Sequence, residues 1–193
     1  YLPVRVAGFL MQKEVDTMGK ALAAPDRPFV AIIGGAKVSD KITVIENLLP
    51  KVDHLIIGGG MANTFLRAKG YATGSSLVEE EKVDVARDLL RKGGDKILLP
   101  TDLVVAKEFK ADADHKVVKA DAVEDGWMAL DIGPDTARAF GAIIKEAMTV
   151  VWNGPMGVFE MPAFARGTFA VAQAMADCEG LTIVGGGDSV AAV

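Results

Sequence analysis

Four short apolar runs in this chain each end in a glycine-rich turn. The segments are FVAIIGGAK (29–37), HLIIGGGMA (54–62), TVVWNGPMG (149–157) and LTIVGGGDS (181–189). Such runs, alternating with helical stretches, indicate a parallel sheet with helices on both faces. A ligand of that kind of sheet lies beyond the carboxyl ends of the strands. Four turns with bare backbone at that edge therefore predict a site for a flat or charged ligand, of which a nucleotide is the best example.

The segments between these runs complete the α/β pattern. Apolar spacing predicts helices over 9–23, 39–49, 61–68, 79–92, 134–147 and 163–177. Short strands are expected at 97–99 and 103–105, an extended segment at 127–133, and a loop or small β excursion over 107–126. No linker is long enough to divide the sequence, so residues 1–193 are expected to form a single domain.

Composition excludes several classes of protein. Half of the 193 residues are hydrophobic and the net charge is −5, which argues against an extended nucleic-acid surface. Cys178 is the only cysteine, so no internal disulfide is possible and a cytoplasmic location is expected. No apolar run approaches the ~18 residues of a membrane span. The chain starts at Tyr1 and stops at Val193 just after a motif, so we expect a piece of a longer protein.

The common nucleotide motifs are absent. GGAKVSDK lacks the second glycine that a Walker A loop places before its lysine. The dinucleotide fingerprint begins with Gly58 and Gly60 but continues with Asn63 instead of a third glycine. Taken alone, each glycine turn is as consistent with a tight connection as with a site.

GGAKVSDKI (34–42) carries a stronger signal. Lys37 and Lys41 are four residues apart, and on the first turn of a helix they would project from one face. With the N–H groups of Gly35 and Ala36 they would converge on one anion. The alternative is a pair of solvated lysines with Asp40 as their partner, but the position directly after a strand favours the anion site.

GGGDS (185–189) places a carboxylate beyond the last strand. Asp188 would hold Mg²⁺ beside a phosphate, because hard cations prefer oxygen ligands. Ser189 and the N–H groups after it could bind that phosphate. The alternative is that Asp188 is a helix N-cap.

WNGPMGVFE (152–160) places Trp, Asn and Glu in a turn, where such residue types are costly unless they contact a partner such as a ligand. Asn153 can donate to a phosphate, Pro155 and Val158 offer an apolar wall, and Glu160 can accept from ribose hydroxyls. The alternative, a packed tryptophan and a surface acid, is the weaker interpretation.

Taken together, the motifs resemble phosphoglycerate kinase, and most closely the carboxy-terminal, nucleotide-binding domain of a bacterial member. The segments that carry the resemblance are GFLMQKE (8–14), GGAKVSDKI (34–42), LIIGGGMANTFL (55–66), WMALDIGP (127–134), VVWNGPMGVFE (150–160), FARGT (164–168) and IVGGGDS (183–189). The resemblance implies a Rossmann-like three-layer domain with a parallel sheet of about six strands. It also implies binding of ADP or ATP with Mg²⁺, for reversible phosphoryl transfer between ATP and the carboxylate of 3-phosphoglycerate.

The resemblance also implies roles for single residues. Lys37 matches the lysine that stabilises the transferring phosphoryl group, and Asp188 matches the magnesium ligand. The nucleotide-binding positions implied are Gly35, Ala36, Lys41, Gly59, Gly60, Ala129, Leu130, Asn153, Pro155, Val158, Glu160, Gly186, Gly187, Asp188 and Ser189.

Parts of the family's pattern are absent from the sequence. These are the amino-terminal domain that binds 3-phosphoglycerate or 1,3-bisphosphoglycerate, and a later glycine cluster. Residues 1–23 would be the helix leading in from that domain. We therefore expect the chain to bind nucleotide without turnover, as part of a monomeric enzyme. Two alternatives stay open, a dinucleotide-binding oxidoreductase domain and a catalytically silent fragment.

Overall fold

The computed structural model describes residues 24–192. The predicted helix over 9–23, and the lead-in from another domain assigned to residues 1–23, lie outside the described residues.

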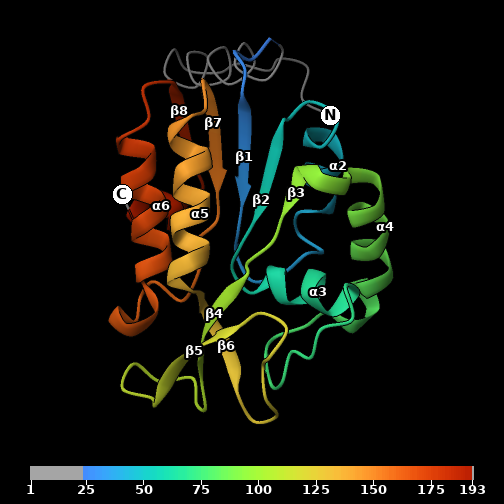
Figure 1. Cartoon of the computed structure of the whole chain (residues 1–193), viewed down its shortest axis with the longest axis vertical. Coiled ribbons are helices and arrows are strands. Elements are labelled where there is room, and N and C mark those ends of the chain that lie inside the picture. The colour runs from blue at the N-terminus through green and yellow to red at the C-terminus, as the bar shows by residue number, and fades with distance from the viewer. Residues whose placement is uncertain (1–23, 193) are drawn as a thin grey trace, which may run out of the picture.

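A five-stranded parallel sheet forms the centre of the described part (Figure 1). Its order is β3-β2-β1-β7-β8. The strands are β1 (Phe29–Ile33), β2 (His54–Ile57), β3 (Ile97–Leu98), β7 (Thr149–Asn153) and β8 (Leu181–Gly185). The glycine-rich turns that follow β1, β2, β7 and β8 therefore share the carboxyl edge of this sheet.

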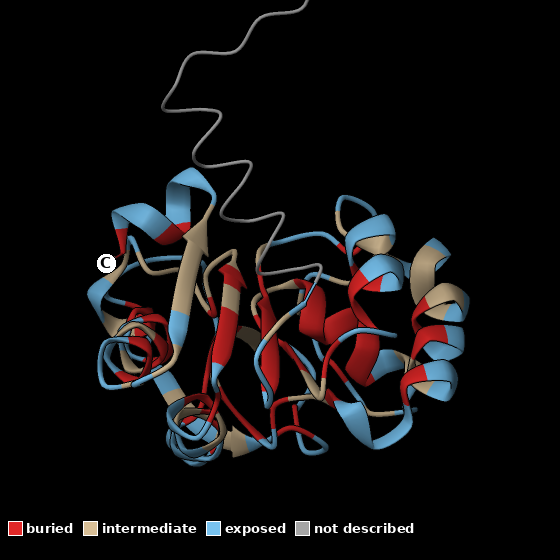
Figure 2. Ribbon diagram, turned by 90° about the horizontal axis from the view of Figure 1, so that it is seen from above, coloured by how far each residue is buried: buried red, intermediate tan, exposed pale blue. Residues whose placement is uncertain are grey.

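Helices cover both faces of the sheet, as the sequence predicts. Alternate residues of β1 point into two separate cores, Phe29 and Ala31 into one and Val30 and Ile32 into the other. The first core packs against α2 (Ile42–Leu48), α3 (Met61–Ala68) and α4 (Val83–Gly93), and the second against α5 (Pro134–Lys145) and α6 (Arg166–Ala176). Figure 2 shows the buried central strands enclosed between the two groups of helices. A short helix, α7 (Gly187–Ala191), follows β8.

A second sheet, of three antiparallel strands, accompanies the parallel sheet. Its order is β5-β4-β6, and its strands are β4 (Asp102–Ala106), β5 (His115–Lys119) and β6 (Met128–Ile132). The parallel sheet has five strands within residues 24–192, against an expected number of about six, and the segments at 103–105 and 127–133 belong to the antiparallel sheet. Pro100, which has no N–H to donate, follows β3 and ends it after two residues.

Asp102 fixes the antiparallel sheet to α5. Its buried carboxylate accepts hydrogen bonds from the amides of Asp135 (3.1 Å) and Thr136 (2.7 Å) and from the Thr136 hydroxyl (2.6 Å). These groups lie in the first turn of α5, which begins at Pro134 as predicted. The antiparallel sheet is thereby held below the carboxyl edge of the parallel sheet in Figure 1.

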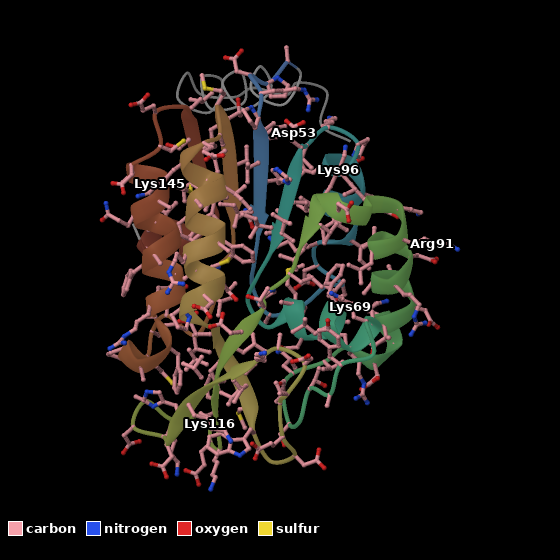
Figure 3. All side chains as sticks on the ribbon, viewed as in Figure 1. Asp53, Lys69, Arg91, Lys96, Lys116 and Lys145 are labelled. Atoms are coloured by element: carbon pink, nitrogen blue, oxygen red, sulfur yellow. The ribbon has the colours of Figure 1, made fainter. Side chains whose placement is uncertain are left out.

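Apart from the buried Asp102 and Asp131, charged side chains lie mainly on the outside of these layers. Figure 3 shows Arg91 on the outer side of α4 and Lys116 on the antiparallel sheet, far from Asp53 at the opposite end of the molecule. Within residues 24–192, no helix has both the length and the apolar composition needed to cross a bilayer.

Candidate functional site

The turns after β1, β2 and β7 form one hydrogen-bonded surface. The amide of Gly35 donates to the Pro155 carbonyl (3.0 Å), and the amide of Gly59 donates to the Met156 carbonyl (3.1 Å). The amide of Met61, at the start of α3, donates to the Gly35 carbonyl (3.0 Å). The N–H of Gly35, expected to face an anion, is therefore already bonded within the protein.

Two glycines make this close approach possible. Gly59 has a φ of +66°, and a Cβ there would lie 2.6 Å from both the amide nitrogen and the carbonyl oxygen of Gly35. Gly154 has a φ of +94°, and a Cβ there would lie 2.3 Å from the Gly34 carbonyl oxygen. A side chain at either position would push the turns apart.

A cavity of about 560 Å³ opens between this surface and the antiparallel sheet. That volume is typical of a small-molecule site. Most of the predicted site residues line it: Gly35, Ala36, Gly59, Gly60, Ala129, Leu130, Pro155, Val158, Glu160 and Asp188. Their roles toward a ligand remain predictions, but the fold brings them together from five separate parts of the chain.

The other predicted residues lie outside the lining of the cavity. They are Lys37, Lys41, Asn153, Gly186, Gly187 and Ser189, the set assigned to phosphate groups. The cavity therefore contains the residues predicted for the base and ribose, and most of those predicted for the phosphates lie outside its lining.

The two lysines are not presented by a helix, contrary to the sequence expectation. Residues 37–41 form a loop and turn, and α2 begins only at Ile42, because Lys41 has φ −121° and ψ −3°, outside the helical region. The Nζ of Lys41 donates to Oδ1 of Asn153 (2.5 Å), while Lys37 is exposed. Among residues 24–192, neither lysine forms an ion pair with Asp40, the partner in the alternative interpretation.

Asp188 is not a helix N-cap. The N-cap of α7 is Gly186, and Asp188 is the second residue of the helix, with an exposed side chain at the mouth of the cavity. Ser189 is buried, and its Oγ accepts a hydrogen bond from the amide of Gly154 (2.7 Å). Asp188 is thus free to ligate a cation, whereas Ser189 joins the β7 and β8 turns.

Trp152 is a core residue, as the weaker interpretation of its motif proposed. It is fully buried, and its indole N–H donates to the Gly154 carbonyl (2.7 Å). The rest of the motif nevertheless borders the cavity, with Glu160 exposed at its rim.

The residues present fit a magnesium ion carried by a nucleotide. Within residues 24–192, no three His, Cys, Asp or Glu side chains form a metal-binding group. One carboxylate completed by phosphate oxygens and water is the ordinary arrangement for Mg²⁺. Asp188 meets that description.

Asp131, on β6, lines the cavity, although the motifs did not single it out. Its Oδ1 accepts from the amide of Ile132 (2.9 Å), and its Oδ2 accepts from the amide of Gly167 (2.8 Å) at the start of α6. A Cβ on Gly157 would lie 2.3 Å from Oδ1. Burial raises the pKa of Asp131 to about 7, against the opposing effect of the two amide hydrogen bonds. The wall of the cavity therefore contains a carboxyl group that titrates near neutral pH.

Two exposed apolar side chains also border the cavity without having been predicted. Leu77 is 52% exposed and Phe109 is 59% exposed, and they approach from different loops. For Phe109 the available signal was a large apolar residue isolated in the polar stretch 107–126. The remaining unpredicted lining residues are Asn63, Ser75, Leu103, Met128, Ile132, Met156 and Gly157.

A larger hollow of about 760 Å³ lies beside β3 and α5. None of the predicted site residues lines it. Lys69 and Lys119 border it together with Asp95, Asp121 and Asp135, so its charges favour no class of ligand.

Comparison with known proteins gives a consistent result. The family described as "Phosphoglycerate kinase" matches residues 1–193. The chain is 70% identical over 196 residues to phosphoglycerate kinase of Moorella thermoacetica, covering 100% of this chain and 50% of that protein. It is 58% identical over 199 residues to the cytosolic phosphoglycerate kinase of Nicotiana tabacum, again covering 100% of this chain and 50% of the relative.

Solved structures agree with these relatives. The structure of phosphoglycerate kinase from Coxiella burnetii superposes with a TM-score of 0.93 at 48% identity, covering 96% of this chain and 48% of that one. Phosphoglycerate kinase from Pyrococcus horikoshii superposes with a TM-score of 0.85 at 34% identity, covering 96% and 48%. The chain therefore spans about half the length of the relatives it matches.

Proposed function

The chain belongs to the phosphoglycerate kinase family, and we propose that it is the carboxy-terminal, nucleotide-binding part of such an enzyme. The observation that carries this proposal is the cavity at the carboxyl edge of the parallel sheet. Its lining comes from the glycine turns of β1, β2 and β7, from β6 and from Asp188. In open α/β sheets this edge is where ligands bind.

The proposed orientation of the nucleotide follows from the two ends of the site. The base enters the enclosed part, where Leu130, Pro155 and Val158 offer apolar surface. Glu160 at the rim accepts from ribose hydroxyls. The phosphates extend toward Lys37, whose side chain is exposed.

The reaction proposed for the complete enzyme is reversible phosphoryl transfer between ATP and the carboxylate of 3-phosphoglycerate. A carboxylate acceptor is ionised near neutral pH, so no general base is required. Catalysis then depends on alignment and on positive charge around the migrating group. Lys37 supplies part of this charge, and Mg²⁺, when bound at Asp188 and the phosphates, neutralises further negative charge. The acceptor would be bound by the part of the enzyme that this chain does not span.

The alternative function is that of a dinucleotide-binding oxidoreductase domain. Calorimetric titration of the chain with Mg·ADP, followed by competition with NADH, distinguishes the two. We expect Mg·ADP to bind at one site and NADH to displace it only weakly. Tighter binding of NADH than of Mg·ADP would support the oxidoreductase domain instead.

Replacing Asp188 with Asn tests the metal role. We expect Asp188→Asn to weaken Mg·ADP binding more than binding of ADP in excess chelator, because an amide is a poorer ligand for a hard cation. Isothermal titration of both proteins, with and without Mg²⁺, gives the comparison. Equal losses under the two conditions would remove Asp188 from the metal site.

A further inference from the structure

Glu79 joins two parts of the proposed site that are distant in sequence. Its Oε2 accepts a hydrogen bond from the amide of Ser39 (3.0 Å), and its Oε1 accepts from the Ser39 hydroxyl (2.6 Å). The backbone of Val38 also lowers the pKa of this carboxylate. These groups belong to residues 37–41, called here the lysine loop, which carries Lys37 and Lys41. Glu79 is thus an anion from within the protein that is bound to the lysine loop.

The segment that carries Glu79 is itself held in place. The amide of Glu79 donates to Oγ1 of Thr64 (3.1 Å), which is buried on α3. Three residues earlier, Oγ of Ser76 accepts from the amide of Ala129 on β6 (2.9 Å). Leu77, between these two attachments, lines the cavity. Glu79 therefore connects the lysine loop to a segment that forms the wall of the base end.

The charge of Glu79 suits this connection. Burial alone would raise the pKa of Glu79. The hydrogen bonds from Ser39, the backbone of Val38 and the nearby charge of Lys37 together have a larger, opposite effect, so the pKa lies below its ordinary value. The side chain is therefore ionised at neutral pH. An ionised acceptor makes stronger hydrogen bonds than a neutral one.

We propose that Glu79 is a positioning residue that fastens the lysine loop to the wall of the base end, so that Lys37 is presented to the phosphates of a bound nucleotide. This role rests on the proposed nucleotide site. Glu79 acts through the loop and not through contact with the ligand, since a carboxylate beside the phosphates would repel them.

Removing the charge of Glu79 has two opposing effects on phosphate binding. Loss of a negative charge favours an anion, but solvent and salt screen such an effect near the surface. Loss of several charge-assisted hydrogen bonds frees the loop, and this effect is larger. Glu81→Gln is the matched control. Glu81 lies two residues after Glu79 and its side chain is exposed, so this change removes the same charge at a neighbouring position.

Amide hydrogen exchange in the ligand-free chain tests the fastening directly. We expect Glu79→Gln to raise the exchange rate of the Ser39 amide about tenfold, with little change in Glu81→Gln. Glu79→Asp, which keeps the charge but shortens the reach, should fall between them. Unchanged exchange at Ser39 in Glu79→Gln would overturn the proposal.

Titration with Mg·ADP and with adenosine, followed by NMR, tests the consequence. We expect Glu79→Gln to weaken Mg·ADP about fivefold to tenfold and adenosine less than about twofold, because only the phosphates need the loop. Equal weakening of both ligands would show a merely structural role and overturn the proposal. A folded wild-type chain that binds neither ligand would defeat the proposed function itself, an outcome distinct from equal weakening.

Discussion

Asp131 shows at the scale of one residue how the cavity wall is built. Its carboxyl group is buried behind the wall, with one oxygen bonded to the strand that carries it and the other to the first turn of α6. Gly157, in the β7 turn, has no side chain and so allows the turn to pack against this carboxyl group. The turn therefore needs glycine at position 157 to lie this close to the carboxyl group of Asp131.

Asp131 also makes stability depend on pH. Burial raises its pKa from 3.8 to about 7, so between these values the folded state binds more protons than the unfolded state. The free energy of unfolding should therefore fall as pH rises through that window and stop falling above the folded pKa. We expect the stability of Asp131→Asn, relative to wild type, to improve from pH 5 to pH 8. Urea unfolding at intervals across this range measures the difference.

Asp53→Asn is the control for that experiment. The amide of Phe29 and the Arg27 guanidinium hold the pKa of Asp53 below its ordinary value, against a smaller opposing effect of burial, so Asp53 stays ionised over the whole range. Its replacement should shift stability by a constant amount. A constant shift for Asp131→Asn as well would contradict the assignment of the pH dependence to Asp131.

At the scale of elements, the glycine turns were the most predictable part of the molecule. Apolar runs that end in glycine identified four of the five parallel strands, and the carboxyl edge then followed from topology alone. The sequence did not show that the turns bond to one another, since the bond from Gly35 to Pro155 joins residues far apart in the chain. For the same reason, the sequence pattern assigned the N–H of Gly35 to an anion, whereas in the fold this N–H donates to the Pro155 carbonyl.

The elements that were mispredicted depend on tertiary contacts. The segment 127–133 reads as an extended run whether its neighbours are parallel or antiparallel, so its sheet could not be assigned from sequence. The start of α2 was placed too early, because Val38 is anchored in the core and Ser39 is bonded to Glu79. Neither contact leaves a periodic signal in residues 37–41.

A substitution in the β2 turn tests the interlocked surface. We expect Gly59→Ala to destabilise the fold by more than about 2 kcal/mol, because a positive φ is strained for alanine and the new Cβ would collide with the backbone of Gly35. Gly70→Ala is the matched control, with a φ of +87° but no atom within 4 Å of a new Cβ. It should cost only about 1 kcal/mol. Chemical unfolding measures the loss of stability in both variants. Equal losses would contradict the inference that Gly59 is needed for the turns to pack against each other.

At the scale of the whole molecule, residues 24–192 offer no cluster of arginines for a second phosphate. Five arginines in residues 24–192 pair with nearby acids: Arg27 with Asp53, Arg67 with Glu80, Arg87 with Asp84, Arg91 with Asp88 and Arg138 with Asp135. Two of them, Arg87 and Arg91, lie on α4, and none of the five lines the cavity. The anchor for the acceptor substrate is therefore proposed to lie in the half of the enzyme that this chain does not span.

This division predicts how activity is distributed. We expect the 193-residue chain to form no ATP from 1,3-bisphosphoglycerate, because alignment of the reactants can supply roughly 7–11 kcal/mol and requires both halves. In an enzyme completed with the rest of a family member, turnover should appear. There, Lys37→Ala should lower kcat about 10²–10³-fold with a smaller effect on nucleotide affinity. Coupled assays of ATP formation measure both, and turnover by the chain alone would contradict the first expectation.

The central claim is that the cavity between the glycine turns and the antiparallel sheet binds the nucleotide. Titration of the isotopically labelled chain with Mg·ADP, followed by NMR at each backbone amide, tests it most directly. The account predicts saturable shifts at Gly60, Ala129 and Gly157, which line the cavity, and none at Lys69 or Asp121 in the hollow beside β3. Shifts confined to that hollow, or no shifts in a folded sample at millimolar nucleotide, would contradict it.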